Sequence, residues 1–82
     1  MIVEVSPSVV KYLSKLDTVT KTRIVKALVK LSAEPPQGDI IKMQGKDGFR
    51  LRVGKYRALF DIDVDNSKII VYDIDVRGQI YK

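Results

Sequence analysis

The 82-residue sequence contains no cysteine and no histidine. Without cysteine, a disulfide scaffold and a thiolate metal site are both excluded. Without histidine, the chain lacks the commonest general base and the commonest metal ligand. Any reaction catalysed by this protein must therefore use other side chains, and no metal or cofactor is expected.

Long apolar runs are missing too, since no stretch approaches the ~20 residues that a membrane span needs. The N-terminus lacks the basic-then-apolar layout of a signal peptide, so we expect a cytoplasmic protein with no membrane association. Glycine and proline are few, while 45% of the residues are hydrophobic and 30% are charged. This composition and length predict one globular domain, residues 1–82, with one modest core.

Negative charge is scarce in the middle of the chain. The net charge of +5 favours nucleic acid, an acidic protein or an anionic surface as the partner. Residues 61–75 carry five aspartates and only one cation. Residues 42–57 carry a single acid beside six cations, which are Lys42, Lys46, Arg50, Arg52, Lys55 and Arg57. This division indicates a built electrostatic site more than a uniformly charged surface.

Residues 49–60 predict the β-hairpin around which the chain is organised. Two alternating runs flank Gly54-Lys55, a pair suited to a two-residue turn. The resulting register gives one apolar face, made of Phe49, Leu51, Val53, Tyr56, Ala58 and Phe60. The other face carries Arg50, Arg52, Arg57 and Leu59, with Arg52 opposite Arg57. Because facing like charges destabilise a sheet, we interpret the arginines as a site for an anionic ligand. A solvated basic face is the alternative.

The rest of the sequence predicts a strand at residues 2–5, two helices and a final strand at residues 69–74. Ser6-Pro7 is typical of a helix start, and Asp17 or Thr18 can cap the second helix. Apolar residues recur at helical spacing in both segments: Val9, Tyr12, Leu13 and Leu16, then Ile24, Ala27, Leu28 and Leu31. We predict an α+β fold of order β-α-α-β-β-β. A two-helix hairpin packs on one face of a small, mainly antiparallel sheet, and residues 40–43 are a further candidate for extended chain.

The register of the last strand depends on the loop that follows residue 62. An odd-numbered loop pairs Arg57 with Asp75 and Leu59 with Asp73, and it places Arg77 on the arginine face. It also sends Ile70, Tyr72 and Ile74 to the apolar side. A two-residue turn would instead put Ile74 opposite Arg57. We favour the odd loop, because only that choice keeps charge with charge.

Six short segments occur along the chain in a characteristic order and spacing: Leu13-Ser14-Lys15-Leu16, Glu34-Pro35, Lys42-Met43-Gln44-Gly45, Phe49–Gly54, Tyr56–Phe60 and Arg77–Tyr81. In this order and spacing, they resemble the RelE/ParE toxin family of toxin–antitoxin modules over nearly the whole chain. Members that resemble RelE cut messenger RNA in the ribosomal A site, and members that resemble ParE inhibit DNA gyrase. The resemblance therefore implies a type II toxin, and we favour the ribosome-dependent endoribonuclease.

By motif position, the resemblance implies a catalytic set and a substrate-binding set. The catalytic set is Arg57, Arg77 and Tyr81, and the substrate-binding set is Arg50, Arg52, Lys42, Lys46 and Lys55. The implied reaction is attack of a ribose 2′-OH on its own 3′-phosphate, which needs a base and cations for the charge on phosphorus. Where many members have a histidine, this sequence has Val76. A gyrase inhibitor and a non-catalytic member that binds its antitoxin stay open as alternatives.

The resemblance also implies the partners of this protein. These are a cognate antitoxin protein, the ribosome and mRNA. It admits a dimer, or a heterotetramer with the antitoxin.

Overall fold

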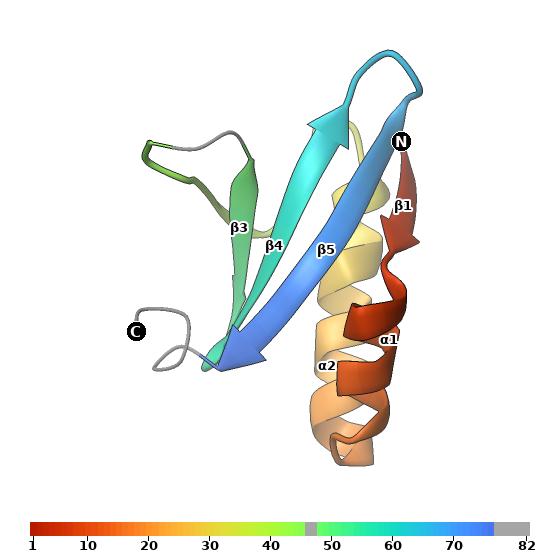
Figure 1. Ribbon diagram of the computed structural model, residues 1–82, viewed down its shortest axis with the longest axis vertical. Helices are drawn as coiled ribbons and strands as arrows, with labels where there is room; N and C mark the ends of the chain where they lie inside the picture. Colours follow the sequence, from red (N-terminus) through yellow and green to blue (C-terminus); the bar gives the residue numbers. More distant parts are fainter. Residues whose placement is uncertain (46–47, 77–82) are drawn as a thin grey trace.

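The computed structural model describes residues 1–45 and 48–76, and they form two layers, one of helices and one a β-sheet (Figure 1). The helices lie together behind one face of the sheet, and the opposite face carries no helix of the described residues (Figure 1). The elements in chain order are β1 (Ile2–Val5), α1 (Pro7–Ser14), α2 (Thr18–Val29), the 3₁₀ turn η1 (Lys30–Ser32), β2 (Asp39–Lys42), β3 (Phe49–Val53), β4 (Tyr56–Asp63) and β5 (Lys68–Val76).

The five strands have the spatial order β1-β5-β4-β3-β2. Only β1 and β5 run parallel, and the other three pairs are antiparallel. The predicted α+β class and the two-helix layer are confirmed. The chain has one strand more than the predicted β-α-α-β-β-β order, because the candidate extended segment forms β2 and pairs with β3.

The helices follow the predicted apolar spacing. Asp17 caps α2, and its side chain accepts a hydrogen bond from the Thr20 amide at 3.1 Å. The core lies between the helices and the sheet, and its buried members are Val9, Leu13, Ile24, Leu28, Leu31, Leu51, Ala58, Phe60, Ile69, Val71 and Ile74. Phe49 and Phe60 stack across β3 and β4 with ring centroids 5.6 Å apart. No helix of the described residues is both long enough and apolar enough to cross a membrane.

The register in which β5 pairs with β4 shifts by one residue at a β-bulge in β5. Close to the loop, Phe60 pairs with Val71 and Asp63 with Lys68, so the loop has four residues, Val64–Ser67. Beyond the bulge, Leu59 pairs with Asp73 and Arg57 with Asp75. Both predicted pairings are therefore correct, but the odd-numbered loop is wrong.

The bulge also corrects the predicted faces. Ile70 pairs with Asp61, so it lies on the face opposite the core, and Tyr72 is the extra residue of the bulge. Ile69 and Val71 take the core positions instead, and both are fully buried. Of the three residues that the odd loop would send to the apolar side, only Ile74 has its predicted partner, Ala58.

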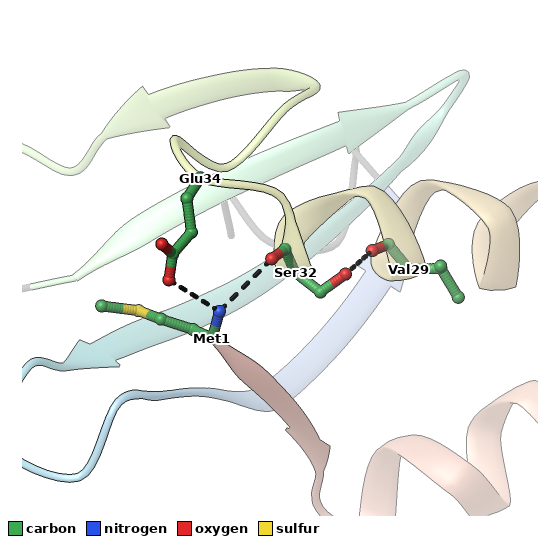
Figure 2. A network of polar contacts seen from close by, with 4 residues as sticks. All are labelled: Met1, Val29, Ser32 and Glu34. Carbon is green, nitrogen blue, oxygen red and sulfur yellow. Dashed lines mark hydrogen bonds and ion pairs between the residues drawn. The ribbon is translucent and has the colours of Figure 1, made fainter.

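The chain before β1 is tied to the end of the helical layer (Figure 2). The Met1 amine donates to the Ser32 carbonyl at 3.3 Å and contacts the Glu34 carboxylate at 3.2 Å. The Ser32 hydroxyl in turn donates to the Val29 carbonyl at 2.7 Å. A positive charge near the last carbonyls of a helix is favourable, so this contact holds β1 against the end of η1.

Candidate functional site

The arginines of the hairpin lie on the sheet face that the helices leave open. The Gly54-Lys55 turn produces the predicted register, in which Val53 pairs with Tyr56 and Arg52 with Arg57. Gly54 has φ +59, a backbone conformation that favours glycine. The turn therefore fixes two guanidinium groups on adjacent strands, and Arg50 stands two residues further along β3 on the same face.

Charged residues form one continuous row across four strands. On β2, Asp39 pairs with Arg52 of β3. On β4, Arg57 stands between Arg52 and Asp75 of β5. The order of charges along this row is negative, positive, positive, negative. The two aspartates thus flank the like-charge pair that is otherwise unfavourable in a sheet.

Arg52 is held at the β2 side of the row by a two-point contact. Its Nε donates to Asp39 Oδ2 at 2.9 Å, and its Nη2 donates to Oδ1 at 3.3 Å. Both side chains are partly exposed, at 44% and 53%. Because water screens such a pair, it contributes only about 0–1 kcal/mol to the free energy of unfolding. The two hydrogen bonds hold the guanidinium against Asp39.

Arg57 is the only charged residue that is buried within residues 1–45 and 48–76, with 3% of its surface exposed. It lies on β4, which has neighbouring strands on both sides. Arg50 is half-buried, and its neighbours in the sheet are Ile41 and Leu59. A cation with limited access to water interacts more strongly with an approaching anion than an exposed one does. Among the described arginines of this face, Arg57 is therefore the one least screened by water.

The carboxylates of β5 are directed to the backbone. Asp73 Oδ1 accepts from the Ile74 amide at 2.9 Å, and Asp75 Oδ1 accepts from the Val76 amide at 2.7 Å. These bonds hold Asp75 at the end of the charged row and Asp73 opposite Leu59. Negative charge therefore borders the arginines along β5.

The structure does not bring all of the proposed site residues together. Lys42 pairs with Phe49 and so lies on the sheet face that carries the core, away from the arginines. Lys55 is at the hairpin turn, with its Nζ 5.7 Å from the centroid of the Tyr56 ring. Lys46, Arg77 and Tyr81 lie outside the described residues, so their roles stay predictions.

Two described tyrosines are poor candidates for a general base. Burial raises the pKa of Tyr72, and the nearby charges of Asp61 and Asp73 raise it further. Burial also raises the pKa of Tyr12, with a smaller effect of Asp75. A raised pKa keeps a phenol protonated near neutral pH, which is the wrong state for accepting a proton.

Comparison with known proteins identifies the family of this chain. A sequence model described as "ParE toxin of type II toxin-antitoxin system, parDE" matches residues 3–81. The chain belongs to the RelE/ParE toxin family. None of the curated protein sequences matches this chain significantly.

Solved structures of RelE proteins share the fold of this RelE/ParE chain. The archaeal RelE–RelB complex from Pyrococcus horikoshii OT3 matches with a TM-score of 0.80 and 27% identity, covering 95% of this chain and 96% of that one. A RelBE toxin–antitoxin complex from Mycobacterium tuberculosis matches with a TM-score of 0.78 and 20% identity, covering 93% and 96%. The isolated Escherichia coli RelE toxin matches with a TM-score of 0.76 and 18% identity, covering 98% and 89%.

Two features of this RelE/ParE chain were not predicted from its sequence. The first is the Asp39–Arg52 contact, which follows once β2 is recognised, since the β2–β3 register puts Asp39 opposite Arg52. The second is the burial of Arg57, for which the local sequence gives no signal. Alternation places Arg57 on the open face, where a charged residue is ordinarily solvated.

Proposed function

We propose that this toxin is a ribosome-dependent endoribonuclease that cuts mRNA in the A site. The observation that carries the proposal is the buried Arg57 with Arg50 and Arg52 beside it, on a sheet face left open by the helices. A folded protein gains little from facing arginines. Polyanionic RNA gives them a role, since guanidinium groups bind phosphate through paired donors.

In the proposed reaction, the 2′-oxygen of one nucleotide forms a bond to the phosphorus of its own 3′-phosphate. The bond from phosphorus to the 5′-oxygen of the next nucleotide breaks, leaving a 2′,3′-cyclic phosphate and a free 5′-hydroxyl. The 2′-hydroxyl loses a proton to a base, and the leaving oxygen gains one. Negative charge accumulates on the non-bridging oxygens in between.

Arg57 is assigned to that charge. A guanidinium fixed before the reaction begins needs little reorganisation as the charge develops. Arg50 and Arg52 are assigned to the neighbouring phosphates, which position the strand. The sequence resemblance assigns Arg77 to charge stabilisation and Tyr81 to the base.

We also propose a cognate antitoxin as the partner of this chain. The Pyrococcus and Mycobacterium relatives named above were solved as toxin–antitoxin complexes. An acidic antitoxin segment would neutralise the arginine face and exclude RNA from it. Such a segment would contact Arg52 and Arg57.

Inhibition of DNA gyrase is the second candidate, because the matching family is described as ParE. The deciding experiment is induced expression followed by mapping of mRNA 5′ ends, beside a gyrase supercoiling assay with purified protein. New 5′ ends at codon positions in translated mRNA, with unaffected supercoiling, are expected. Inhibited supercoiling without new mRNA ends would overturn the endoribonuclease proposal in favour of the gyrase inhibitor.

A further inference from the structure

A hollow of about 290 Å³ lies at the tip of the β3–β4 hairpin, on the helix side of the sheet. We call it the hairpin-tip pocket. Its walls come from α2 and from the hairpin, and the residues that line it are Thr20, Arg23, Ile24, Val53, Lys55 and Tyr56. None of these residues was assigned to the substrate except Lys55.

The two cations of the pocket approach it from different elements. The Arg23 side chain reaches from α2 to the turn, where a Cβ atom added at Gly54 would lie 3.1 Å from its Nη2. The absence of a side chain at Gly54 therefore leaves room for this guanidinium. Lys55 follows Gly54 in the turn and lies beside the Tyr56 ring.

The charge of the pocket is not neutralised from within. Among the described residues, neither Arg23 nor Lys55 makes an ion pair, and no acid lines the pocket. By contrast, Arg52 and Lys68 each pair with a carboxylate. A hollow lined by one sign of charge attracts an ion of the opposite sign.

Apart from the polar Thr20, the rest of the lining is apolar or aromatic. Ile24 is 1% exposed, and Val53 is partly buried beside it. The Tyr56 ring meets the Tyr12 ring edge to face, with centroids 6.5 Å apart and planes at 75°. Two cations next to an apolar and aromatic surface match a phosphate joined to a flat ring. The volume is near the lower limit of about 300 Å³ for small-molecule pockets, which suits a single nucleotide.

We propose that the hairpin-tip pocket binds one nucleotide of an RNA strand, with the phosphate between Arg23 and Lys55 and the base against Val53 and Tyr56. The identity of the strand as RNA rests on the proposed function. The same hairpin carries Arg52 and Arg57 on its other face. A strand bound to the arginine face and passing the Gly54-Lys55 turn would therefore reach the pocket.

The first test measures binding of a short 2′-O-methyl oligouridylate, which lacks the attacking hydroxyl and cannot be cleaved. Fluorescence anisotropy over a series of salt concentrations gives the affinity and its salt dependence. For Arg23→Ala/Lys55→Ala, the slope of log affinity against log salt should fall by roughly 0.7, because the two cations bind one phosphate and each lost phosphate contact removes ~0.7. The matched control is Lys11→Ala/Lys21→Ala, which removes two exposed helix cations that do not line the pocket.

Arg52→Ala is measured in parallel to separate the two proposals. If the pocket variant matches the control while Arg52→Ala weakens binding, the pocket proposal is overturned and the arginine face stands. If the wild-type protein binds neither the oligonucleotide nor ribosomes, the proposed function fails together with the pocket. Thermal melts establish that all three variants are folded.

The second test asks whether the pocket recognises a nucleotide or any anion. Uridine 5′-monophosphate and ribose 5-phosphate are titrated separately into the isotope-labelled protein. The amide signals of Thr20, Val53 and Tyr56 should shift with uridine monophosphate at lower concentrations than with ribose phosphate. Equal affinities would overturn the base contact, and shifts confined to residues 50–52 and 57 would overturn the site.

Discussion

Arg57 lies directly across the β4–β5 ladder from Asp75 and, on its other side, directly across from Arg52. A buried cation is therefore placed between one negative and one positive neighbour. Burial distinguishes Arg57 from Arg52, which is exposed and contacts Asp39. The two arginines should respond differently to substitution.

Arg57→Ala should abolish toxicity and lower stability. Losing one fixed donor to a developing negative charge typically costs about 10²–10³ in rate. Removing the positive charge that faces Arg52 is favourable. However, deleting a side chain that is only 3% exposed leaves unfilled space and unsatisfied groups. That loss should dominate, at about 1–3 kcal/mol. Growth assays of induced strains and thermal melts check both effects. A folded Arg57→Ala protein that still cuts mRNA fully would show that Arg57 has no catalytic role.

Asp39→Asn should tighten RNA binding with little effect on stability. The substitution releases Arg52 from its two-point contact, so one further cation can meet a phosphate. The salt slope of oligonucleotide binding should rise by roughly 0.7, and stability should change by at most about 1 kcal/mol. The control is Glu4→Gln, which breaks the 3.4 Å contact with Lys68 near the other edge of the sheet. Weaker RNA binding by Asp39→Asn would mean that Asp39 positions Arg52 for the substrate.

Gly48→Ala should destabilise the protein more than Gly45→Ala. Both glycines have positive φ, +112 and +70, so both substitutions strain the backbone. At Gly48 the new Cβ would also lie 2.7 Å from Asp61 Oδ1, 3.0 Å from Met43 Cε and 3.3 Å from the Phe60 backbone oxygen, whereas at Gly45 nothing lies within 4 Å. The two side-chain ends can move aside but the backbone oxygen cannot, so the extra cost at Gly48 should be on the order of 1 kcal/mol. Urea unfolding of the two variants measures the difference, and equal midpoints would refute the steric argument.

The Asp17 cap should make stability depend on pH in the acid range. Hydrogen bonds from Thr20 lower the pKa of Asp17 below its ordinary 3.8. The unfolded chain therefore takes up the proton first as the pH falls. The stabilisation is complete above pH 3.8 and is lost as the pH falls through the lowered folded pKa.

Asp17→Asn separates this charge effect from capping itself. Asparagine also caps helices well but does not titrate. Melting temperatures of the wild-type protein and of Asp17→Asn should therefore diverge above pH 4 and converge in stronger acid. A constant difference between them across the range would rule out titration of Asp17 as the cause.

The sequence predicted those parts of the fold that depend on local pattern. The Gly54-Lys55 turn determined the β3–β4 register and, through it, the apposition of Arg52 and Arg57. The bulge was missed because it depends on where Ile69 and Val71 meet the core, which is a property of the packed sheet. The Asp39–Arg52 contact was missed because residues 40–43 were recognised only as a candidate for extended chain. A short edge strand carries little signal before its partner strand is known.

The bulge at Tyr72 has a consequence for matching this chain to its relatives. The two halves of β5 are out of phase by one residue: Ile69 and Val71 face Ile62 and Phe60 in the core, whereas Asp73 and Asp75 face Leu59 and Arg57 on the open face. A relative with an unbroken strand would need a one-residue gap at this point to keep both halves in correspondence. An ungapped alignment that matches Ile69 and Val71 would be wrong by one residue after the bulge. It would match the relative's counterparts of Asp73 and Asp75 to the residues next to these two aspartates. Site residues in this strand are therefore best transferred by their partners on β4, and not by counting from the core.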